Sequence, residues 1–117
     1  MTAAALASRL RIGQSVVEEP RFEAATGLLL ASAPTWDPNN GTIDEYYWYH
    51  GTHALAGVGG APFAQWARQL GPMLVTAQRR DGYAKGSWDP IGVWGQAGGR
   101  VYSTAILALA LQPIARS

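Results

Sequence analysis

A chain of 117 residues allows a single domain, and its hydrophobic fraction of 48% is high enough for a packed core rather than a disordered tail. Nine Lys and Arg against eight Asp and Glu give a formal net charge of +1, and the basic residues are scattered, which argues against a nucleic-acid-binding surface. The absence of cysteine excludes a disulfide framework, a thiolate zinc site and a thiol nucleophile.

The first ten residues are apolar but do not have the order of a secretory signal. Arg9 and Arg11 come after the apolar run, whereas a signal peptide carries its basic residues before it. No stretch reaches the roughly 18 uninterrupted apolar residues that a membrane span needs. We therefore expect neither a signal peptide nor a membrane span, and a cytoplasmic location by default.

The first two helices are expected over residues 3–11 and 20–33. Pro20 suits the first turn of a helix, where its missing N–H would have no partner in any case. The apolar residues of this second helix are Phe22, Ala25, Leu28 and Leu29. Pro34 ends it, because proline cannot continue a helix.

A third helix is expected over residues 43–58 and is apolar on all sides, which is typical of a helix buried on both faces. Its apolar residues are Ile43, Tyr46, Tyr47, Trp48, Tyr49, Ala54, Leu55 and Val58. Thr42 followed by Glu45 fits a capping box that would start this helix. The aromatic run also suits a β-strand, but the lack of polar and apolar alternation favours a helix.

The fourth helix, expected over residues 62–78, has a single apolar stripe. The stripe consists of Phe63, Trp66, Ala67, Leu70, Met73, Leu74 and Ala77, and the opposite face carries Gln65, Arg68, Gln69 and Thr76. This pattern indicates an outer, half-solvated helix. Gly71 and Pro72 interrupt it, and we expect a kink or a restart there.

The fifth helix is expected over residues 100–112 and is again apolar all round, with Gly98 and Gly99 before it and Pro113 after it. Fully buried helices thus alternate with half-buried ones along the chain. That alternation is typical of a two-layer ring or superhelix of helical hairpins.

An internal repeat accompanies this alternation. Trp36-Asp37-Pro38 recurs as Trp88-Asp89-Pro90, 52 residues later. The same offset places Thr52 on Thr104, Leu55 on Leu107 and Ala56 on Ala108. Residues 2–6 are a weaker third copy about one period before Thr52. We interpret residues 1–117 as one partial repeat domain in which the Trp36 and Trp88 loops are equivalent.

Two groups of residues resemble a known family. Gln78-Arg79-Arg80-Asp81-Gly82, followed by Gly86-Ser87-Trp88, resembles the glutamine–tryptophan motif of squalene and hopene cyclases, in which the Gln ends an outer helix and the Trp lies in the next loop. Residues 46–52 and 86–104 resemble a bacterial branch of prenyltransferase and squalene-oxidase-repeat proteins. The resemblance extends from about Thr2 to Leu111, and residues 86–104 are its most specific part.

The resemblance implies an all-α fold, an α/α-toroid, of which this chain would be an incomplete barrel of about five helices. The ring could not close within one copy, so we expect the remaining repeats of a parent chain, or self-association, to supply its neighbours. It also implies a structural role for the motif residues Trp36, Asp37, Gln78, Gly82, Trp88 and Asp89. A Gln at a helix end can bond exposed backbone groups, and a Trp can cover it.

The activities of the family are not supported by this stretch. Its cyclases protonate the substrate with a cluster of closely spaced aspartates, whereas Asp37, Asp44, Asp81 and Asp89 stand apart. The zinc site of the protein prenyltransferases and the thioester of a further branch both need a cysteine. We therefore predict no catalytic residue, no cofactor and no metal, and we expect no enzymatic activity in this chain alone.

The candidates for a ligand-binding lumen are Tyr46, Tyr49, His50, His53, Arg100 and Tyr102. Residues three and four apart share a helix face, so the first four could line a lumen together. The alternative is that their rings and hydroxyls are satisfied within a packed inner helix. A two-histidine metal site would lack a third histidine.

The loops leave further alternatives open. Asp37, Asn39 and Asp44 around Gly41 faintly resemble a calcium loop, but the spacing lacks the terminal bidentate Glu, so an Asx turn is the favoured interpretation. We expect Asp89 and Arg100 to bond neighbouring backbone or each other.

Two functions remain after the sequence analysis. One is a non-catalytic toroid segment that acts as a scaffold or binding surface, with a hydrophobic small molecule as a further ligand. The other is a fragment of a terpene-cyclase-like or carbohydrate-active enzyme whose catalytic acids lie outside this chain. The five tryptophans could stack on sugars, but that chemistry needs paired carboxylates at a cleft.

Overall fold

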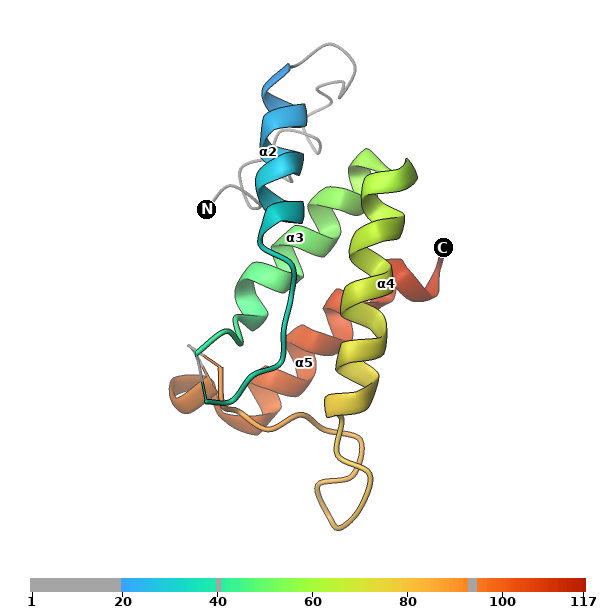
Figure 1. Ribbon diagram of the computed structural model, residues 1–117. Coiled ribbons are helices and arrows are strands. Elements are labelled where there is room, and N and C mark those ends of the chain that lie inside the picture. The colour runs from blue at the N-terminus through green and yellow to red at the C-terminus, as the bar shows by residue number, and fades with distance from the viewer. Residues whose placement is uncertain (1–19, 40, 93–94) are drawn as a thin grey trace.

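The structure is a computed structural model that describes residues 20–39, 41–92 and 95–117. Within these ranges there are four helices and no strand: α2 (Pro20–Ala31), α3 (Glu45–Val58), α4 (Gly60–Ala77) and α5 (Gly95–Ala115), shown in Figure 1. The predicted all-α class is confirmed for this part of the chain. The four helices expected after residue 19 are present, and the one expected over residues 3–11 lies outside the described residues.

α3 and α4 form an antiparallel hairpin with almost no loop. Gly59 and Gly60 have φ angles of 73° and 64°, a left-handed backbone that glycine adopts at little cost. The N–H of Gly59 donates to the carbonyl of Leu55 at 2.8 Å and closes the last turn of α3. Two consecutive glycines therefore reverse the chain within two residues.

The start of α3 differs from the prediction. Asp44 is the N-cap residue, and its Oδ1 accepts a hydrogen bond from the N–H of Tyr47 at 3.1 Å. The predicted capping box at Thr42 and Glu45 is therefore wrong. The hydroxyl of Thr42 instead donates to the carbonyl of Thr35 at 2.9 Å, so it closes the preceding loop.

α3 and α5 share the largest contact between helices and run parallel to each other. Near the start of both helices, the hydroxyl of Ser103 donates to Oε1 of Glu45 at 3.2 Å. Further along both, Nε2 of His53 lies 3.2 Å from the carbonyl oxygen of Leu109. α4 packs against both helices and α2 packs against α4.

The core lies where α3, α4 and α5 meet, and two indoles form its centre. The indole N–H of Trp66 donates to Oγ1 of Thr52 at 2.9 Å, and the hydroxyl of Thr52 donates to the carbonyl of Trp48 at 2.7 Å. The apolar residues buried with them are Leu29, Ile43, Ala54, Leu55, Leu70, Leu74, Trp88, Leu107 and Ala110. Each large side chain among these contributes about 1.5–3 kcal/mol by leaving water.

α4 is amphipathic, as predicted. Trp66, Leu70 and Leu74 are buried, whereas the polar residues on the opposite face are exposed. Of the kink or restart expected at Pro72, the restart does not occur, because the helix continues from Gly60 to Ala77. The carbonyl that Pro72 leaves without a donor belongs to Arg68, and both residues are exposed, so water can bond it.

α5 is not the fully buried helix that its composition predicted. Gly99 has φ 76° and ψ −173°, which breaks the helix, so the continuous part begins at Arg100. Leu107 and Ala110 face the core, but Val101 is 83% exposed and Leu109 is 44% exposed. α3 likewise exposes Tyr46, at 43%. Within the described residues neither helix is buried on both sides, and for α5 this agrees with the expectation that its neighbours come from outside this chain.

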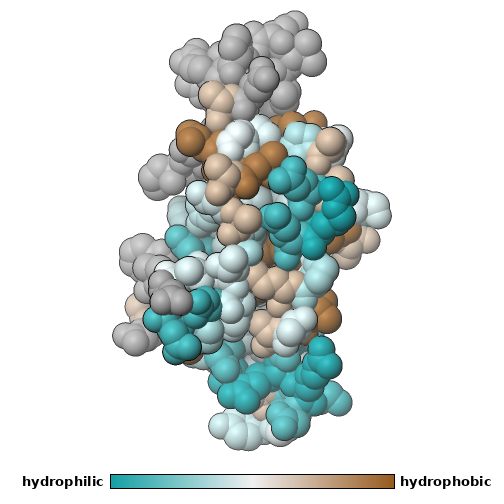
Figure 2. Space-filling model, in the orientation of Figure 1, coloured by the Kyte–Doolittle hydropathy of each residue, from teal (hydrophilic) through white to brown (hydrophobic). Residues whose placement is uncertain are grey.

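Polar and apolar side chains are distributed unevenly over the surface. Hydrophilic residues gather over the loop that follows α4, at the lower end of the view, and in a second patch in the upper half, where apolar residues near α2 are also exposed (Figure 2).

Candidate functional site

Four of the predicted lumen residues form a row of rings on α3. The ring centroids of Tyr46 and His50 are 4.5 Å apart, those of Tyr49 and His50 are 5.0 Å apart, and those of Tyr49 and His53 are 4.7 Å apart. All three contacts are edge-to-face, the arrangement that ring quadrupoles favour. The structure therefore brings these four residues together on one helix face.

The other two predicted lumen residues, Tyr102 and Arg100, lie in different parts of the structure. Tyr102 on α5 lies near this row: burial raises the pKa of its hydroxyl, and the negative charges of Glu45 and Asp44 raise that pKa further. Arg100 points toward the loop between α4 and α5, where it binds Asp89. Arg100 therefore does not join the ring row.

Glu45 is a buried acid in the seam between α3 and α5. Its side chain is sealed from solvent, with 1% of the residue exposed, and Oε1 accepts the hydrogen bond from Ser103. Oε2 has no hydrogen-bond partner among the described residues. The backbone of Gly92 packs closely on the carboxyl group, since a Cβ there would lie 2.8 Å from Oε1.

The pKa of the Glu45 carboxyl is raised, and burial is the main cause. The hydrogen bond from Ser103 acts in the opposite direction, whereas the charge of Asp44 raises the pKa further. The backbone of Gly92 also lowers this pKa, but the loss of hydration on burial makes the carboxylate harder to form here than in water. Glu45 is thus a buried residue of the seam between α3 and α5 and not the capping residue that the sequence predicted.

The loop between α4 and α5 is held against the last turn of α4 by two motif residues. Gln78 directly follows α4, and its Nε2 donates to the carbonyl of Gly86 at 2.9 Å. Trp88 is 3% exposed, and its Nε1 donates to the carbonyl of Leu74 at 2.9 Å. Both side chains therefore bond the backbone of the same hairpin end.

A charged cluster lies beside Trp88. Oδ1 of Asp89 lies 2.9 Å from Nε of Arg79 and 2.9 Å from Nη2 of Arg100, which confirms the expected contact between Asp89 and Arg100. The hydrogen bond from Arg79 is the main cause that lowers the pKa of Asp89. Because these side chains are a third to a half exposed, solvent screens both ion pairs and they contribute little to stability.

The remaining motif residues occupy turns. Trp36 is half-buried, and its ring centroid lies 6.1 Å from that of Trp48. Oδ1 of Asp37 accepts the N–H of Asn39 at 3.0 Å, so the predicted Asx turn is confirmed. Gly82 has φ 70° in the exposed loop after α4, where a side chain would be strained.

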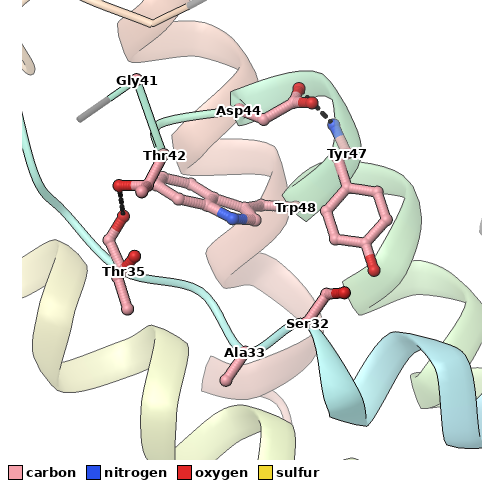
Figure 3. A pocket seen from close by; sticks show the side chains of 8 residues that line it. All are labelled: Ser32, Ala33, Thr35, Gly41, Thr42, Asp44, Tyr47 and Trp48. Carbon is pink, nitrogen blue, oxygen red and sulfur yellow. Dashed lines mark hydrogen bonds between the residues drawn. The ribbon is translucent and has the colours of Figure 1, made fainter.

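A pocket of about 380 Å³ lies between the loop after α2 and the start of α3 (Figure 3). Its lining residues are Ser32, Ala33, Thr35, Gly41, Thr42, Asp44, Tyr47 and Trp48. Figure 3 shows that its polar groups bond locally: Thr42 to Thr35, and Asp44 to the N–H of Tyr47. Trp48 is only 2% exposed, so its ring offers no stacking platform.

A shallow groove of about 480 Å³ runs along the outside of α5. It is lined by Ser87, Arg100, Val101, Thr104, Ala105 and Ala108. Its walls are mainly apolar, and Arg100 stands at one end. The groove coincides with the face of α5 that the sequence analysis expected to be buried.

The described residues contain neither a candidate metal-binding cluster nor a candidate membrane span. No three His, Asp or Glu side chains there could hold a metal ion. None of the helices there is long and apolar enough to cross a membrane. Comparisons of the chain with protein-family models, curated proteins and solved structures found no match.

Proposed function

We propose that this chain is a non-catalytic segment of an α/α-toroid protein of the squalene-cyclase and prenyltransferase type, and that it acts as a scaffold or binding surface. The surface in question is the outer face of α5, formed by Val101, Ala105, Ala108 and Leu109. All four residues are exposed.

The observation that carries the proposal is the relation between this face and the contact face of α3. Glu45 and His53 are the residues of α3 that bond to α5. The residues 52 positions later are Ala97 and Ala105, and both are exposed, as is Val101 between them. In helical repeats each unit packs on the next through the same face. The outer face of α5 is therefore equivalent to the face of α3 that packs on α5, but it has no such neighbour among the described residues.

The residues of the seam support a structural role. Glu45 is the one buried acid among the described residues, and it is closed off from any substrate. His53 is engaged with the carbonyl of Leu109, and His50 lies between Tyr46 and Tyr49. No feature of the described residues favours the enzymatic alternative, so it is not proposed.

Binding of an environment-sensitive apolar dye tests the proposal. The wild-type chain should bind the dye at low protein concentration, because the outer face of α5 is open. Val101→Glu should reduce dye fluorescence severalfold, whereas Val75→Glu, an exposed change on α4, should leave it unchanged. Failure of the dilute wild-type chain to bind dye would contradict the proposal.

A further inference from the structure

The pocket between the loop after α2 and the start of α3 carries a negative charge. Asp44 is the only charged side chain among the described residues that line it (Figure 3). Its Oδ1 accepts the N–H of Tyr47, which leaves Oδ2 as the oxygen that can meet a ligand. The positive end of the α3 dipole, equivalent to about half an elementary charge, weakens the negative charge but does not cancel it. The pocket therefore favours a cation.

The sequence around the pocket contains no basic residue that could neutralise Asp44. Residues 22–67 contain four acidic residues and neither Lys nor Arg. Six of the nine basic residues lie within residues 68–117, which contain two acidic residues. The part of the chain that forms the pocket is therefore acidic, and a cation for this pocket has to come from outside residues 22–67.

The charge of Asp44 acts on the rest of the pocket lining. Burial raises the pKa of the Tyr47 hydroxyl, and the negative charge of Asp44 raises that pKa further. Ser32 and Thr35 add further hydroxyl groups to the lining. The pocket thus combines one anion with neutral hydrogen-bond acceptors, which suits a cation that donates several hydrogen bonds.

The loop before α5 shows which cation the corresponding place holds there. Nη1 of Arg100 donates to Oγ of Ser87 at 2.9 Å, and Nη2 of Arg100 lies 2.9 Å from Oδ1 of Asp89. The residues 52 positions earlier are Trp48, Thr35 and Asp37. The loop before α3 thus keeps the hydroxyl and the carboxylate, but an indole replaces the guanidinium group.

We infer that this pocket binds the guanidinium group of a ligand, with Asp44 as its anionic partner. A guanidinium group is planar, always charged and carries five N–H donors, so it can bond a carboxylate and neighbouring hydroxyl oxygens together. The pocket volume of about 380 Å³ is near the lower end of the range of small-molecule sites, about 300–1,000 Å³. The inference is independent of the proposed function, which concerns the outer face of α5.

Titration with L-argininamide, followed by NMR spectroscopy of the backbone amides, tests the inference. The N–H of Tyr47 is bonded to Asp44 and therefore reports on that carboxylate. Its signal and that of Thr42 should shift to saturation. L-citrullinamide has the same backbone and an uncharged group of similar shape, so it should bind at least tenfold more weakly. Equal binding of the two compounds would overturn the inference.

Asp44→Asn removes the charge of the pocket while keeping the helix cap, because Asn and Asp are equally good N-cap residues. This variant should bind L-argininamide at least tenfold more weakly than wild type. Asp81→Asn, an exposed change in the loop after α4, is the matched control and should bind like wild type. Wild-type affinity in Asp44→Asn would overturn the role of this carboxylate.

A guanidinium group can come from a free compound or from an arginine side chain within a peptide, and a third titration distinguishes these sources. An acetylated and amidated glycine–arginine–glycine peptide should shift the Tyr47 signal if the pocket accepts an arginine side chain. Shifts with L-argininamide alone would identify a free guanidinium compound as the ligand. If neither compound shifts the Tyr47 signal, the inference is overturned.

Discussion

Trp88 joins the loop after α4 to the core through both its ring and its N–H. The residue is 3% exposed, and its Nε1 donates to the carbonyl of Leu74, which also accepts the N–H of Gln78 at 3.0 Å. Trp88→Ala would therefore leave that carbonyl bonded but create a cavity. Truncating a buried Trp costs about 3–5 kcal/mol, a large part of the stability of a small domain.

We expect Trp88→Ala to lower the melting temperature markedly in thermal unfolding followed by circular dichroism. Tyr83→Ala in the same loop is the matched control, because Tyr83 is fully exposed and should be replaceable at little cost. Equal melting temperatures for wild type and Trp88→Ala would show that the indole is not part of the core.

Glu45 makes stability depend on pH in a defined direction. Its pKa in the fold is raised above the ordinary value of 4.5, so unfolding releases a proton at pH values between the two pKa values. The favourable contribution of the neutral acid is complete below pH 4.5 and is lost as the pH rises through the raised pKa. Glu45 therefore makes the fold less stable toward neutral pH.

Glu45→Gln should remove the decrease in stability toward neutral pH, since a neutral amide can still accept the hydrogen bond from Ser103. Its melting temperature should exceed that of wild type at pH 7 and approach it at pH 4. Asp81→Asn, an exposed carboxylate in the loop, is the control and should not change the slope. A variant whose melting temperature follows the wild-type pH curve throughout would mean that Glu45 is not buried as described.

At the level of elements, the contact between α3 and α4 depends on a glycine. A Cβ at Gly51 would lie 2.8 Å from Cζ2 of Trp66, a ring that is fully buried and cannot move aside. Gly51→Ala should therefore cost about 1–3 kcal/mol through overpacking, despite the better helix propensity of alanine.

Gly27 on α2 provides the matched control for this substitution. It also lies within a helix, but nothing is within 4 Å of a Cβ placed there. Gly27→Ala should be neutral or stabilise by up to about 1 kcal/mol. Chemical denaturation of both variants would reveal the difference, and a Gly51→Ala variant as stable as Gly27→Ala would contradict the close packing of α3 on α4.

The helices could be predicted from sequence because their signals are local. The apolar stripe of α4 and the prolines and glycines at helix ends lie within one or two turns of the features they specify. The N-cap of α3 could not be predicted, since Thr42 and Asp44 are both good caps. Asp44 is the cap because the hydroxyl of Thr42 is engaged elsewhere: it binds the carbonyl of Thr35, seven residues upstream.

The site was less predictable because its contacts connect distant residues. Helical spacing was enough to group Tyr46, Tyr49, His50 and His53. The burial of Glu45 depends on Ser103, 58 residues away, and no local pattern indicates it.

At the level of the whole molecule, the exposed outer face of α5 agrees with the expectation that an incomplete ring leaves apolar surface uncovered at its ends. Apolar residues on every side show that a helix has neighbours in its functional state, but not which chain provides them. The core of the described residues covers only the inner side of α5, at Leu107 and Ala110. The proposed binding surface is therefore the side of α5 that the described core leaves uncovered.

Thiol labelling of Val101→Cys measures the state of that face most directly, because the engineered thiol is the sole cysteine in the chain. At low protein concentration it should react as fast as Val75→Cys, since both positions are more than half exposed. A Val101→Cys thiol that is protected even at the lowest concentration would show that the outer face of α5 is already covered within one chain.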